Sequence, residues 1–130
     1  MNKNNQDDAE VRQFIVDQVD SVPHLEALLL LWNSRPQSWR PDELARRLYV
    51  NSEVAKSLLE DLARQGLIEL DASPERYCYR DERDDRSRLI GLVDKTYRRE
   101  IIRISTLIHS KPSLPLRDFA RAFRFTKDGG

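Results

Sequence analysis

The sequence predicts a mainly helical protein with one small two-stranded sheet. Apolar residues recur at helical spacing in several separate stretches, which prolines rather than glycines divide. The period changes to that of short strands only after Gly66. The chain has 130 residues, 39% of them hydrophobic, so it is long enough to bury a core of its own.

The first two helices are expected on either side of Ser21. Apolar residues recur near helical spacing over Asp8–Val19, which predicts the first helix. Pro23 suits the first turn of the next helix. That helix is apolar on most of its circumference, so we expect it to lie at the centre of the core. Its apolar residues are Leu25, Leu28, Leu29, Leu31 and Trp32.

A short helix, a tight turn and a longer helix are expected next. Pro41 and the two acidic residues behind it are typical of a helix start, and they predict a helix over Pro41–Leu48. After the turn, either Asn51 or Ser52 can cap a helix that runs to residue 65. Gly66 then supplies the left-handed conformation that ends many helices.

Two short β-prone runs follow Gly66. They are Leu67–Leu70 and Arg76–Arg80, and the residues between them include Asp, Ser and Pro, which favour turns. This arrangement predicts a hairpin.

The order of these elements resembles a winged helix-turn-helix domain of the kind found in MarR-like bacterial transcriptional regulators. The resemblance covers about 60 residues, from the leucine-rich helix to Arg80, and Trp39–Leu70 carries its motif. The matching positions are Glu43, Leu44, Ala45, Leu48, Ala55, Leu58, Leu59, Leu62, Gly66, Leu67 and Ile68.

The resemblance implies a function in DNA-linked regulation. In such domains the second helix of the motif reads the major groove and the hairpin, or wing, contacts the backbone or the minor groove. The corresponding helix here begins at Ser52. The DNA-binding residues implied are Arg46, Arg47, Ser52, Lys56, Ser57 and Arg76.

The charge pattern favours an alternative function. The whole chain has 22 basic and 22 acidic residues, and residues 42–80 contain six basic and eight acidic ones. A surface of that balance is poorly suited to displace phosphate counterions. Arg40 also stands where a Ser or Thr cap usually precedes such a helix. The alternative is a winged-helix adaptor that binds proteins rather than DNA.

A long helix is expected over Asp85–Ser110, where apolar residues are spaced three or four apart. Its stripe is wider than one small domain readily covers, which favours pairing with a second copy of the chain. The alternative is that the helix packs back on its own domain. The expected homodimer interface consists of Ile90, Val93, Tyr97, Ile101, Ile104 and Ile108.

A short amphipathic helix is expected at the end of the chain, after Pro115. Leu116, Phe119 and Phe123 lie on its apolar face. That face can dock on the long helix, enter a groove of a protein partner, or lie on a membrane surface. The sequence therefore divides into a winged domain over residues 1–80 and a dimerisation or interaction region over residues 81–130.

Several classes of protein are excluded or disfavoured. Two histidines and one cysteine make a zinc site of usual spacing and an internal disulfide impossible, and the sequence indicates no cofactor. No Ser/His/Asp or paired-carboxylate set stands out, so we do not expect an enzyme. The longest apolar run is far shorter than the roughly 20 residues of a membrane span, and the first residues do not resemble a signal peptide. We expect a cytoplasmic protein.

Overall fold

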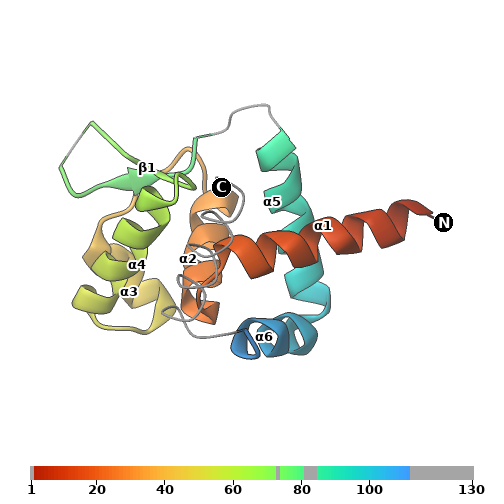
Figure 1. The fold of residues 1–130 in the computed structure, drawn as a ribbon. Coiled ribbons are helices and arrows are strands. Elements are labelled where there is room, and N and C mark those ends of the chain that lie inside the picture. Colours follow the sequence, from red (N-terminus) through yellow and green to blue (C-terminus); the bar gives the residue numbers. More distant parts are fainter. Residues whose placement is uncertain (1, 73, 81–84, 112–130) are drawn as a thin grey trace, which may run out of the picture.

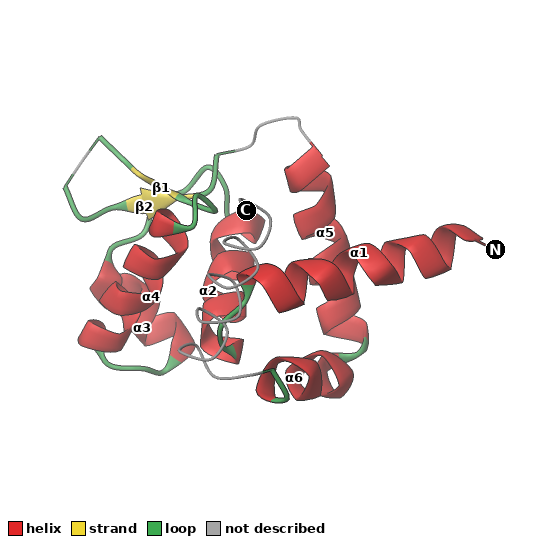
Figure 2. Cartoon of the chain, viewed as in Figure 1, coloured by secondary structure: helices red, strands yellow, loops and turns green. Residues whose placement is uncertain are grey.

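The computed structural model describes residues 2–72, 74–80 and 85–111. Within this part the chain is mainly helical and has one antiparallel two-stranded sheet (Figure 2). The helices are α1 (Asn2–Gln18), α2 (Val22–Asn33), α3 (Pro41–Leu48), α4 (Ser52–Arg64), α5 (Asp85–Arg99) and α6 (Ile101–His109), and the strands are β1 (Glu69–Leu70) and β2 (Tyr77–Cys78).

Helix α2 lies at the centre of the molecule, as its composition predicted. Leu25, Leu28 and Leu31 are completely buried. Figure 1 shows α3, α4 and the hairpin on one side of α2, and α1, α5 and α6 on the other. The buried side chains of both sides belong to one continuous hydrophobic core, which therefore runs across the boundary predicted at residue 80. That boundary remains a prediction from the sequence.

Local signals explain where α3 and α4 begin and end. The backbone N–H of Arg40 donates to Glu43 Oε1 (2.9 Å), so a glutamate in the first turn helps to complete a helix start that lacks a Ser or Thr cap. Asn51 caps α4, because its Oδ1 accepts the backbone N–H of Val54 (2.8 Å). Gly66 has a φ of 77° and ends α4 in the left-handed conformation that the sequence indicated.

The hairpin is shorter than predicted but has the expected position. Glu69 pairs with Cys78 and Leu70 pairs with Tyr77. Tyr77 also exchanges two backbone hydrogen bonds with Trp39, at 2.7 and 2.9 Å, which ties the hairpin to the segment before α3. The hairpin is therefore attached at the start of the α3–α4 pair.

The prediction of one continuous helix over Asp85–Ser110 is wrong. Glu100 has φ −132° and ψ 54°, so α5 ends immediately before it and α6 begins immediately after it. The hydrogen bonds on either side continue, from Glu100 N to Thr96 O (2.8 Å) and from Ile104 N to Glu100 O (3.0 Å). A single non-helical residue thus bends the chain without the proline or glycine that would have marked the bend in the sequence.

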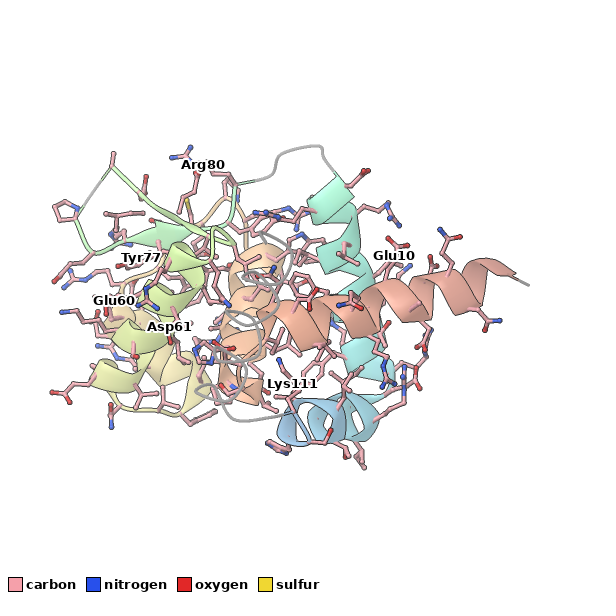
Figure 3. The ribbon with its side chains drawn as sticks, in the orientation of Figure 1. Glu10, Glu60, Asp61, Tyr77, Arg80 and Lys111 are labelled. Carbon is pink, nitrogen blue, oxygen red and sulfur yellow. The ribbon has the colours of Figure 1, made fainter. Side chains whose placement is uncertain are left out.

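The bend allows α6 to pack against α1. Arg103 Nη2 binds Asp8 Oδ1 (2.7 Å) on α1, and the Nζ of Lys111 donates to the carbonyl oxygens of Ile15 (2.7 Å) and Val19 near the end of α1 (Figure 3). A lysine at this position also complements the negative end of the helix dipole.

The placement of α5 and α6 corrects the predicted dimer interface. Ile101 is the one predicted interface residue that is exposed, with half of its surface accessible (50%). The other five are at most 8% exposed in the core of the chain itself: Ile90, Val93, Tyr97, Ile104 and Ile108. Helices α1 and α2 cover the stripe, so these five residues cannot form the seam between two folded copies.

Two further sequence predictions concern the terminal helix and the absence of a membrane-spanning helix. The terminal helix with Leu116, Phe119 and Phe123 lies outside the residues that the structure describes. Among those it does describe, no helix is both long and apolar enough to cross a membrane.

Candidate functional site

The exposed face of α4 is the first candidate site. Ala55, Leu58, Leu59 and Leu62 are buried on the opposite face, which packs on α3 and α2. Ser52, Lys56 and Ser57, three of the predicted DNA-binding residues, are exposed on the outer face. Glu53 and Glu60 are exposed on the same helix. The amphipathic pattern of α4 thus leaves a polar surface with charges of both signs.

Two further predicted residues, Arg46 and Arg47, are exposed on α3. Arg46 is 3.8 Å from Asp42 in a solvated contact one helical turn away, which constrains it little. The guanidinium of Arg47 lies 5.5 Å from the centre of the Trp39 ring. This cation–π contact holds Arg47 against the protein more firmly than Arg46.

Arg76, a further predicted DNA-binding residue, also makes contacts within the chain. Its Nη1 lies 3.4 Å from both Glu43 Oε1 and the carbonyl oxygen of Ser38, and only 33% of its side chain is exposed. Arg76 therefore joins the hairpin to α3 and to the segment before it. Sequence reasoning missed this role because the partners are more than 30 positions away in the chain.

Ion pairs offset part of the negative charge around α3, α4 and the hairpin. Asp42, Glu43, Asp61 and Glu69 each pair with an arginine. Glu53 and Glu60 have no such partner among the described residues. Burial raises the pKa of Tyr77 on β2, and the charges of Glu60 and Glu75 raise it further. Figure 3 labels Glu60 and Tyr77 on this side of the molecule.

The turn between α3 and α4 contains an unusual tyrosine. Tyr49 has a φ of 58°, in the left-handed region that favours glycine, and it is 93% exposed. Its backbone N–H donates to the carbonyl of Ala45 and so ends α3. The position requires a left-handed backbone, and the side chain contributes almost no packing in return.

A chain of hydrogen bonds that sequence reasoning missed links α2 to α4. Ser21 Oγ lies 2.6 Å from His24 Nδ1, and His24 Nε2 lies 2.8 Å from Asp61 Oδ2. Asp61 Oδ1 also binds Arg64 (3.0 Å). Burial raises the pKa of Asp61, but the hydrogen bonds from His24 and Arg64 outweigh burial and lower it overall. Figure 3 shows Asp61 on the side of α4 that faces α2.

These three residue types also occur in hydrolase triads, but their arrangement here indicates a structural role. Ser21 Oγ accepts the backbone N–H of His24 (3.2 Å) as the N-cap of α2. The chain Ser21–His24–Asp61 therefore holds the start of α2 against the third turn of α4.

A cleft of about 510 Å³ lies between α2, the end of α3 and α5. Leu29, Leu30 and Leu48 line its apolar part, and Glu26 and Asp94 bring carboxylates to it. No group of three or more acidic, histidine or cysteine side chains in the described ranges is arranged to hold a metal ion.

No protein-family model matches the sequence, and no curated protein matches it either. Among solved structures, the crystal structure of RV1404 from Mycobacterium tuberculosis is similar to this chain, with 19% sequence identity and a TM-score of 0.48. The similarity covers 99% of this chain and 88% of that one. A similarity at this level assigns neither a fold family nor a function, so the function has to be argued from the residues above.

Proposed function

We propose that the protein is a DNA-binding transcriptional regulator of the winged helix-turn-helix class. In this proposal α4 enters the major groove and the β1–β2 hairpin lies beside the backbone. The observation that carries it is the pairing of α3 with α4 across a tight turn, with Ser52, Lys56 and Ser57 on the exposed face of α4. Hydroxyl and ammonium groups at such positions donate to phosphate oxygens and base edges.

The ion pairs around α3 and α4 support the proposal. Residues 42–80 have an excess of acids by count, but the arginine pairs of Asp42 and Asp61 reduce the field that these two carboxylates present to a phosphate. Arg46 and Lys56 then supply positive charge from α3 and α4. We expect weak DNA binding with a steep salt dependence, because few cations make the phosphate contacts.

Fluorescence anisotropy with a library of genomic fragments, at about 50 and about 200 mM salt, tests the proposal. Lys56→Ala and Arg46→Ala should each weaken binding across all fragments and reduce the salt slope by about one unit. Lys95→Ala is the matched control, since Lys95 is an exposed lysine on α5. Wild-type protein that binds no fragment at low salt would refute the function, and unchanged binding by both variants would refute the proposed face.

A second candidate function is a winged-helix adaptor that binds proteins. The observation in its favour is that three of the exposed large hydrophobic side chains, Tyr49, Val54 and Leu70, lie on the α3–α4 turn, α4 and β1. The unpaired Glu53 and Glu60 on α4 also repel phosphate. In this case Lys56→Ala would leave partner binding nearly intact, whereas Val54→Glu would abolish it.

We also propose a homodimer, but through a different surface from the buried stripe. Ile101 and Ile102 at the start of α6 are 50% and 79% exposed and adjacent in sequence. They are the large apolar side chains that α5 and α6 leave accessible, and a second copy of the chain would cover them.

A further inference from the structure

The cleft between α2, α3 and α5 is open to solvent and has the volume of a small-molecule site. Its volume of about 510 Å³ lies within the range of roughly 300–1,000 Å³ that is typical of ligand pockets. Leucine side chains from α2 and α3 and the ring of Tyr97 from α5 give it apolar walls.

The polar groups of the cleft centre on a buried carboxylate. Asp94 is only 8% exposed, and its Oδ1 accepts hydrogen bonds from both Asn33 Nδ2 (3.2 Å) and Arg98 Nε (3.1 Å). No described residue donates to its Oδ2. This oxygen keeps contact with solvent, so it can accept a hydrogen bond from a ligand in the cleft.

A second carboxylate lies in the same cleft. The hydroxyl of Tyr97 donates to Glu26 Oε2 (3.1 Å), which leaves Oε1 without a partner in the described structure. Burial, and next the charge of Glu26, raises the pKa of Tyr97. Tyr97 therefore stays protonated near neutral pH, and its hydroxyl holds the exposed side chain of Glu26 at the cleft.

Two arginines, Arg47 and Arg98, line the cleft beside the two carboxylates. Arg47 is held over the Trp39 ring. Arg98 is 65% exposed and donates Nε to Asp94, so water screens its charge. The carboxylate of Asp94 is more buried than the guanidinium of Arg98. Water therefore screens the attraction between Asp94 and a ligand less than it screens the charge of Arg98.

We propose that this cleft binds a small organic cation with an amidinium, guanidinium or ammonium head and a flat apolar body. The head donates to Asp94 Oδ2 and Glu26 Oε1, and the body packs on Leu29, Leu30 and the Tyr97 ring. A delocalised, planar head suits two carboxylates better than a point charge, because it can donate to both at once. The site does not depend on the proposed DNA binding.

Isothermal titration of the full-length protein with three matched probes tests the site. Benzamidine carries the cationic head, benzamide is its neutral analogue, and benzoate is its anionic one. We expect saturable binding of benzamidine, with benzamide at least about tenfold weaker and benzoate weaker still, since a charge-assisted hydrogen bond is lost and then replaced by repulsion. Equal or tighter binding of benzoate would overturn the proposal.

Three variants locate the site. Glu26→Gln and Asp94→Asn should each weaken benzamidine binding about tenfold or more. Arg98→Gln should strengthen it, because it removes the cation that shares the Asp94 carboxylate; the exposed position of Arg98 leaves the fold intact if Asp94→Asn does not fold. Glu10→Gln, on an acid of α1 that pairs with Arg88, is the control and should change nothing. Benzamidine binding that none of the three cleft variants alters would refute the site.

Discussion

Replacing Tyr49 by glycine should stabilise the protein, although it removes a large aromatic side chain. A non-glycine residue in the left-handed region costs roughly 1–2 kcal/mol, and Tyr49 has a φ of 58°. Glycine offsets part of the gain, about 0.4–1 kcal/mol, because it is more flexible in the unfolded chain. With 93% of Tyr49 exposed, almost no buried area is lost. The expected net gain is about 0.5–1 kcal/mol.

Thermal melts and urea titrations measure this gain. For a domain of this size it corresponds to an increase in Tm of roughly 2–4 °C. Tyr49→Ala is the matched control, since it removes the side chain and keeps the unfavourable backbone, and it should leave Tm within about 1 °C of wild type. A lower Tm for Tyr49→Gly would show that the side chain makes stabilising contacts, and the reasoning from exposure would then be wrong.

Three further predictions concern the packing of the helices and the proposed dimer. Asp61→Asn should lower stability at pH 7, because the folded state depresses the pKa of Asp61. The stability that the charged carboxylate contributes is present above a pH of about 4 and is lost as the pH falls. Urea titrations should therefore show the wild type and the variant converging near pH 2. Gly91→Ala should leave Tm within a few degrees of wild type, because the roughly 1 kcal/mol by which alanine stabilises a helix interior offsets the contact of the added Cβ with the ring of Trp32 at 3.2 Å. Ile102→Glu should convert a dimer into a folded monomer in analytical ultracentrifugation, and a wild-type monomer at tens of micromolar would refute the proposed dimer.

The elements with local signals were predicted well from the sequence. The helix over Pro41–Leu48 has the predicted bounds, and the next helix begins where Asn51 can cap it. Gly66 has the left-handed backbone expected of it. Each of these signals acts within a few residues, through a cap, a fixed φ or a glycine, so the chain nearby is enough to determine it.

The bend at Glu100 could not be predicted in the same way. The apolar spacing of three and four continues across it, and no proline or glycine is present there. The bend lets α6 pack on α1, where Arg103 binds Asp8, almost a hundred residues apart in the chain. A tertiary contact of this kind has no counterpart in a helical pattern, and the same limitation explains why the stripe of Ile90 and Ile104 was read as a dimer seam.

The candidate sites show the same division between local and long-range information. Exposure of Lys56 and Ser57 followed from the amphipathic pattern of their own helix. The inward role of Arg76 and the carboxylates of the cleft depend instead on partners from distant segments, such as the hydroxyl of Tyr97 on Glu26. Aspartate and glutamate residues most often lie on the solvated surface, so the sequence does not distinguish Asp94 from the other acids. Its burial in the structure does.

The position of the cleft connects it with the helices proposed to contact DNA. Leu48 and Tyr49 line the cleft at the end of α3, and α4 begins three residues beyond that turn. On its other side α4 is held to α2 by the His24–Asp61 hydrogen bond. A ligand that packs between α2 and the end of α3 therefore lies against one of the two supports of α4. If its affinity differs between the orientations that α4 adopts on and off DNA, DNA must change the ligand affinity by the same factor.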